Sequence, residues 1–174
     1  MTKILGIAGS LRAASSSQAV LRAVLDHLPK GVTHATARIG DIPHYNADIG
    51  GGAPVADFTA AVAAAEGLIF VTPEYNYSIP GVLKNAIDWA SRPAYASVFV
   101  GKPCLIISVS AGALGGVRAQ AHLKYILNGM LANVYPCQEM VVPQAPQKMQ
   151  DGIFADKAVV DFISTQVAGF CDTL

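Results

Sequence analysis

The sequence predicts an α/β protein built on a doubly wound, five-stranded parallel sheet with helices on both faces. Short apolar runs alternate along the chain with longer segments whose apolar residues recur at helical spacing. The run Gly67–Thr72 (GLIFVT) is apolar throughout, which is typical of a strand buried on both faces of a sheet. Five such strands alternating with five helices indicate a parallel sheet between two helical layers.

The predicted strands are short and rich in residues that favour extended backbone. The first run, KILGIA, is too short for a helix and ends at a glycine. The second carries Thr33, Thr36 and Ile39, which favour strands. A glycine-rich turn follows the fourth. The strands are predicted at Lys3–Ala8, Val32–Ile39, Gly67–Thr72 and Lys102–Ser108, with the fifth inside Asn133–Val142.

The predicted helices carry apolar residues three and four positions apart. The first repeats them from Val20 to Leu28, the second is almost all alanine, and the fourth repeats them from Leu123 to Met130. The Gly/Pro-rich stretch Gly50–Pro54 is predicted to be a loop. The helices are predicted at Ser17–Leu28, Ala56–Ala65, Val82–Ser91, Ala119–Leu131 and Phe154–Phe170.

Length and charge restrict the class of protein. The chain has 174 residues, which suits one domain spanning residues 1–174, and 12 Lys and Arg balance 12 Asp and Glu. Zero net charge without a basic run argues against nucleic-acid binding, which needs a concentrated positive surface. Only 14% of the residues are charged, so we expect an oligomer in which apolar surfaces are buried between subunits.

The expected location is the cytoplasm. No apolar stretch reaches the roughly 20 residues that span a bilayer, and the N-terminal MTKILGIAGS lacks a signal-peptide pattern. Cys104, Cys137 and Cys171 are widely spaced without a CxxC motif, which suits a reducing compartment. The scattered histidines have no metal-ligand spacing, so we predict no metal ligand.

Three unusual loops follow the first, third and fourth predicted strands. Ligands of doubly wound sheets bind beyond the carboxyl ends of the strands, so these loops form the candidate site. Gly9–Ser17 offers four serine hydroxyls, a guanidinium and a helix N-terminus, which together attract an anion. The loop lacks both the Walker and the GxGxxG pattern, which favours a phosphate that is held and not transferred. Simple helix capping by its serines is the competing interpretation, and it leaves Arg12 unexplained.

The other two loops are suited to a planar ring. Pro73–Gly81 (PEYNYSIPG) places tyrosines, an amide and a hydroxyl beside exposed backbone, although a rigid turn with packed tyrosines would look the same. The helix that follows would aim its N-terminus at the same cleft. Ser108–Arg118 has three glycines that permit close backbone approach, although by itself it would be read as a flexible turn.

Taken together, these motifs resemble a known family. GSLR with its following serines, PEYNYSIPGVLKNAIDW and SAGALGGVRAQ are similar to segments of the NADPH-dependent FMN reductases, a flavodoxin-like group that includes bacterial quinone and chromate reductases. The resemblance runs from the first strand to about Gln120. It implies a flavodoxin-like fold with strand order 2-1-3-4-5 and FMN as the cofactor.

The resemblance also implies roles for individual residues. The first loop would hold the FMN phosphate through Ser10, Arg12, Ser15, Ser16 and Ser17, although relatives often have Asn at the position of Ser17. The second would line the ring and ribityl chain through Pro73, Glu74, Tyr75, Asn76, Tyr77 and Ser78. The third would close the other edge of the ring through Ser110, Ala111 and Gly112, with Gly115 and Gly116 keeping the turn and Arg118 adding positive charge.

The implied activity is an FMN-dependent NAD(P)H oxidoreductase. NADPH or NADH would deliver hydride to the flavin, which would then reduce quinones, free flavins, chromate or other small acceptors in a ping-pong cycle. The flavin carries the chemistry, so no catalytic side chain is predicted. A homodimer or homotetramer is implied. We expect N–H groups to satisfy Glu74, which is therefore not a general base, and Cys104 to be a core residue.

Two alternatives belong to other classes. One is a flavodoxin-type electron carrier without its own nicotinamide site, and zero net charge counts against the acidic docking face of such carriers. The other is a non-flavin interaction protein that keeps only the fold. Whether Arg12 or Arg118 meets the dinucleotide stays open at this point.

Overall fold

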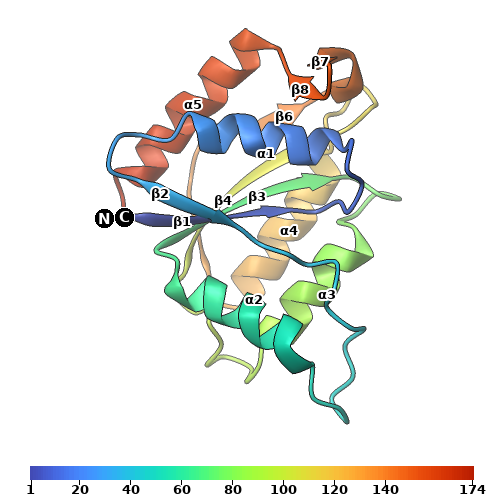
Figure 1. The fold of residues 1–174 in the computed structure, drawn as a ribbon, viewed down its shortest axis with the longest axis vertical. Coiled ribbons are helices and arrows are strands. Elements are labelled where there is room, and N and C mark those ends of the chain that lie inside the picture. The colour runs from blue at the N-terminus through green and yellow to red at the C-terminus, as the bar shows by residue number, and fades with distance from the viewer.

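A parallel β-sheet runs through the middle of the protein (Figure 1). The computed structural model describes residues 1–174. The strand order is β2-β1-β3-β4-β5, with β6 also paired to β4, as predicted for a flavodoxin-like fold. The strands are β1 (Lys3–Ala8), β2 (Thr33–Thr36), β3 (Gly67–Pro73), β4 (Pro103–Val109), β5 (Asn133–Val134) and β6 (Met140–Val142).

Helices cover both faces of this sheet (Figure 1). On one face lie α1 (Ser16–Asp26) and α5 (Lys157–Cys171), and on the other lie α2 (Gly52–Ala64), α3 (Gly81–Ala90) and α4 (Val117–Gly129). The predicted three-layer arrangement is therefore confirmed. None of the helices has both the length and the apolar character that crossing a membrane requires.

The core consists of two apolar clusters, one on each face of the sheet. Along β3, Leu68 and Phe70 belong to the cluster under α2, α3 and α4, whereas Ile69 and Val71 belong to the cluster under α1 and α5. This alternation explains why the run GLIFVT has no polar positions, because both sides of the strand are covered.

Several predicted element ends are wrong. The second strand ends at Thr36 rather than Ile39, because its pairing with β1 stops opposite Gly6. Helix α2 begins at Gly52, inside the predicted loop, and Pro54 is tolerated there because the first turn of a helix needs no N–H donor. The fifth strand is split, since β5 pairs with the start of β4 and β6 with its end.

A small hairpin that was not predicted from the sequence precedes the last helix. Strands β7 (Met149–Gln150) and β8 (Ile153–Phe154) pair antiparallel around Asp151 and Gly152, whose φ values are 50° and 78°. Helix α5 therefore begins three residues later than predicted, after Asp156, whose carboxylate accepts from the Val159 N–H at 3.1 Å. Lys148 also pairs with Asp156, and these bonds hold the pKa of that carboxyl below its ordinary value.

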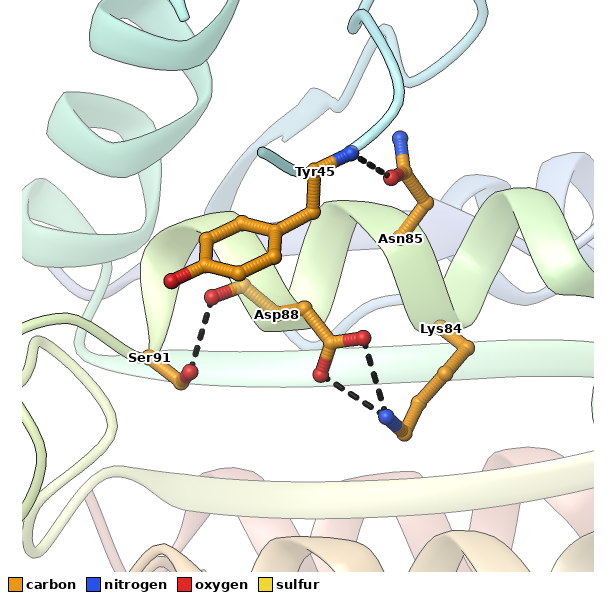
Figure 2. A network of polar contacts seen from close by, with 5 residues as sticks. All are labelled: Tyr45, Lys84, Asn85, Asp88 and Ser91. Carbon is orange, nitrogen blue, oxygen red and sulfur yellow. Dashed lines mark hydrogen bonds and ion pairs between the residues drawn. The ribbon is translucent and has the colours of Figure 1, made fainter. Parts of the chain in front are cut away.

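Helix α3 fixes the loop that follows β2 (Figure 2). The Asn85 side chain accepts from the Tyr45 N–H at 2.7 Å and donates to the Pro43 carbonyl at 2.9 Å. The Trp89 indole donates to the same carbonyl at 2.8 Å, and its ring meets Tyr45 edge-on at 5.0 Å. The LKNAIDW part of the motif therefore holds a loop that would otherwise leave backbone groups without partners.

Replacing Asn85 with alanine should lower the free energy of unfolding by about 1–3 kcal/mol, because backbone groups of the loop lose their partner. Urea unfolding measures this change. The matched control is Lys84→Gln on the same helix, which removes a part-exposed pair with Asp88 at 2.8 Å (Figure 2) and should cost about 0.5 kcal/mol or less. Equal losses in the two variants would contradict this role of Asn85.

Candidate functional site

The loops after β1, β3 and β4 meet in one cleft at the carboxyl edge of the sheet. The cleft has a volume of about 250 Å³. All three loops singled out in the sequence contribute to it, together with the segment after β6. It is lined by Ser10, Arg12, Ser15, Ser16, Ser17, Pro73, Glu74, Tyr75, Val109, Ser110, Ala111 and Pro146.

The first loop forms the N-terminus of α1 as a group of hydroxyls. Ser15 is the N-cap: its Oγ accepts from the Ser17 N–H at 3.2 Å and lies 2.7 Å from the Ser17 Oγ. Ser10 is buried as well, and its carbonyl accepts from the Gln18 side chain at 2.8 Å. Capping thus accounts for Ser15, while the remaining hydroxyls, the first-turn N–H groups and Arg12 stay grouped at the cleft.

Arg12 is the one basic residue of the cleft lining. Its side chain is exposed, lines the cleft, and belongs to none of the ion pairs of the protein. A guanidinium beside a helix N-terminus and several hydroxyls is a donor set that suits a phosphate, which accepts charge-assisted hydrogen bonds.

The second loop makes a tight two-residue turn. Tyr75 and Ser78 exchange backbone hydrogen bonds of 2.9 and 3.1 Å, while Asn76 and Tyr77 have φ values of 48° and 70°. This geometry is that of a type I′ turn, which is strained for residues other than glycine and asparagine. Tyr75 lines the cleft, and its hydroxyl lies 3.5 Å from the Ser10 Oγ.

Glu74 joins the second loop to helix α4. One carboxylate oxygen accepts from the Arg118 and Ala119 N–H groups at 3.1 and 3.4 Å, and the other pairs with the Arg118 guanidinium at 3.1 Å. The expectation that N–H groups satisfy this carboxylate agrees with the geometry. The Arg118 guanidinium also lies over the ring of Tyr77, 4.4 Å from its centre.

The third loop turns sharply into α4. The Ser110 Oγ accepts from the Gly112 N–H at 2.9 Å. Gly115 and Gly116 have φ values of 60° and 84°, so both occupy the left-handed region. A Cβ on Gly116 would lie 3.0 Å from the Val109 carbonyl oxygen, which shows how closely the turn approaches the end of β4.

Two residues of the cleft lining were not among the predicted site residues: Val109, within the third loop at the end of β4, and Pro146, after β6. The Pro146 segment is held against the third loop, because the Ala145 N–H donates to the Ser110 carbonyl at 2.9 Å. The signal was available: the fifth strand of a parallel sheet ends at the same edge as the others, so the loop PQAPQ was a candidate too.

Some of the predicted site residues lie outside the cleft lining. The Ser78 Oγ, for example, is 3.0 Å from the His122 Nδ1 on α4. Asn76 and Tyr77 of the turn also lie outside the lining, as do three residues of the third loop. The set comprises Asn76, Tyr77, Ser78, Gly112, Gly115 and Arg118.

None of the three cysteines lines the cleft. Cys104 is fully buried in β4, where burial raises the pKa of its thiol to about 12, so it remains protonated as a core residue. Burial also raises the pKa of Cys137 and of Cys171. No group of three or more His, Cys, Asp or Glu side chains is arranged to hold a metal ion.

A parallel sheet of this order, with a phosphate-type donor set at the first helix and a turn of aromatic residues beside it, defines a flavodoxin-like flavin-binding class of protein. The chain belongs to the NADPH-dependent FMN reductase family, whose model matches residues 2–147. It is therefore an oxidoreductase that uses FMN with a nicotinamide donor.

Similar proteins agree with this assignment. The chain is 43% identical to an NAD(P)H-dependent FMN reductase of Pseudomonas aeruginosa, covering 90% of this chain and 86% of the relative. It is 38% identical to a quinone reductase of Escherichia coli, covering 97% and 93%. The solved structure of FerB, a flavoenzyme NAD(P)H:(acceptor) oxidoreductase from Paracoccus denitrificans, superposes with a TM-score of 0.85 at 34% identity, covering 99% and 96%.

Replacing Gly116 with alanine should lower the free energy of unfolding by about 1–3 kcal/mol, because a side chain there is strained and crowds β4. Urea unfolding of the cofactor-free protein measures the loss. Gly112→Ala is the control, since its added Cβ would meet only the Ser110 Oγ at 3.4 Å. An unchanged free energy of unfolding in Gly116→Ala would contradict the predicted strain and show that the turn relaxes around the added side chain.

Proposed function

We propose that the cleft binds FMN, takes hydride from NADPH or NADH, and passes electrons to quinones, free flavins, chromate or other small acceptors in a ping-pong cycle. The observation that carries the proposal is the convergence of three loops, far apart in the sequence, around the hydroxyl-rich N-terminus of α1. The quinone reductase relative supports quinones as acceptors. We infer that residues 1–174 form one FMN-binding domain, since both core clusters pack on the same sheet.

The phosphate of FMN fits the donor set at α1. Ser10, Ser15 and Ser17 supply buried hydroxyls, Ser16 supplies another beside them, and Arg12 supplies a cation. The first-turn N–H groups and the helix dipole favour a negative ligand at this place. Together these residues would bind the terminal phosphate and orient the rest of the cofactor outward along the cleft.

The ring of FMN would lie between the second and third loops. Pro73, Glu74 and Tyr75 line one wall, and Ser110 and Ala111 line the other. Asn76, Tyr77 and Ser78 lie on the adjoining turn, and Gly112, Gly115 and Arg118 shape the third loop. We infer that these backbones hold the ring edges while Gly115 and Gly116 permit the close approach.

FMN supplies the hydride chemistry when it is bound, and the protein supplies position and electrostatics. Backbone N–H groups of the second and third loops would stabilise negative charge on the ring. The open side of the cleft would admit the nicotinamide and then the acceptor in turn. Arg118 forms an ion pair with Glu74, whereas Arg12 forms no ion pair. This difference favours Arg12 as the residue that would bind the FMN phosphate.

We infer that the protein is a homodimer or homotetramer of the cytoplasm. The low charged fraction of 14% and the exposed side chains of Tyr77, Leu114 and Tyr125 support an oligomer. Three free cysteines support a reducing compartment.

The purified protein tests the proposed function directly. It should take up FMN stoichiometrically, lose the absorbance of oxidised flavin on anaerobic addition of NADPH or NADH, and regain it when a quinone is added. Bound FMN that neither nicotinamide bleaches would identify an electron carrier. Failure to take up FMN would identify an interaction protein that keeps only the fold.

Replacing Arg12 with alanine should weaken FMN binding by about tenfold or more, since a charge-assisted bond contributes roughly 1.5–3 kcal/mol. Fluorescence titration of the cofactor-free protein with FMN measures the dissociation constant. Arg38→Ala is the matched control, because Arg38 is exposed, pairs with Asp41, and lines a separate cavity. Unchanged FMN affinity in Arg12→Ala would remove Arg12 from the phosphate site.

A further inference from the structure

Glu74 is an acidic side chain in the wall of a cleft that receives a negatively charged cofactor. Its side chain is 14% exposed and lines the cleft directly. A bare carboxylate there would oppose any increase of negative charge on a bound ring. The surroundings of Glu74 therefore decide how strongly it acts on the cofactor.

We propose that Glu74 is a positioning residue whose ion pair with Arg118 keeps the ring wall electrically neutral and thereby sets the midpoint potential of the bound flavin. This inference rests on the proposed function, namely that FMN occupies the cleft. It assigns Glu74 and Arg118 a joint electrostatic role, distinct from direct contact with phosphate.

Glu74 contacts both the N-terminus of α4 and the cation beside it. Its carboxylate accepts from two first-turn N–H groups, those of Arg118 and Ala119, and so lies at the positive end of the helix dipole. The same carboxylate pairs with the Arg118 guanidinium at 3.1 Å. Tyr77 lies against that guanidinium, so the cation is held beside Glu74 by contacts on two sides.

The sign of the effect follows from charge balance. A hydride brings two electrons and one proton, so the ring gains one negative charge if no second proton follows. Removing the Glu74 charge leaves Arg118 and the helix N-terminus uncompensated, which stabilises the reduced ring. Removing the Arg118 charge leaves the carboxylate uncompensated, which destabilises it.

The test measures the potential of the FMN-loaded protein against reference dyes under anaerobic conditions. At a fixed dye potential, Glu74→Gln should raise the ratio of reduced to oxidised FMN about threefold or more, and Arg118→Gln should lower it by a similar factor. The double variant should return to within about twofold of the original protein. Both single shifts should shrink as salt is added, because Arg118 is 42% exposed.

Glu139→Gln is the matched control. Glu139 pairs with Lys124 on the same helix at 2.7 Å but lines a different cavity, so its loss should leave the potential unchanged. Shifts of the same sign in both single variants, or no shift in either, would overturn the electrostatic role while leaving FMN binding intact. An original protein that takes up no FMN would overturn the proposed function together with this inference.

Discussion

The site depends on the parallel hydrogen bonding of β1, β3 and β4. Their register places Ala8 beside Val71, and Pro73 beside Val109, so the three strands end at nearly the same level. The Gly9 N–H extends the pairing by donating to the Val71 carbonyl at 2.9 Å. Loops separated by dozens of residues in the chain therefore leave the sheet side by side. Without that common edge, the serines of one loop and the tyrosines of another would not share a cleft.

The N-termini of α1 and α4 contribute to the electrostatics of the site in two different ways. At α1 the N-terminus is capped within the loop by Ser15, so its dipole and remaining donors face the cleft. At α4 the N-terminus has no cap of its own, and Glu74 reaches across from another loop to supply it. The N-terminus of α1 therefore faces the cleft, whereas two N–H groups at the N-terminus of α4 are bound by Glu74. The same contrast distinguishes Arg12, which belongs to no ion pair, from Arg118, which is paired with Glu74.

Much of the fold and of the site could be predicted from the sequence because those parts are local or periodic. The buried strands, the helices and the three loops follow from apolar patterns and from motifs such as PEYN. The pairing of Glu74 with Arg118 could not be predicted, since it depends on how a turn at Asn76 and Tyr77 is oriented against α4. Pro146 was missed because its segment follows a strand that is broken in two. The role of Asn85 required knowing which loop lies beside α3.

The broken fifth strand has a consequence for solubility. A sheet edge with a long run of unpaired backbone donors and acceptors invites another strand to add to it, which leads to aggregation. Here one edge of the sheet is β2, four residues long and largely exposed, and the other is divided into pieces of two and three residues. Pro136 lies in the interruption and has no N–H to offer an incoming strand. Only 14% of the residues are charged and 52% are hydrophobic, so surface charge gives this protein little protection against aggregation. Its short edge strands provide protection that surface charge provides in other proteins.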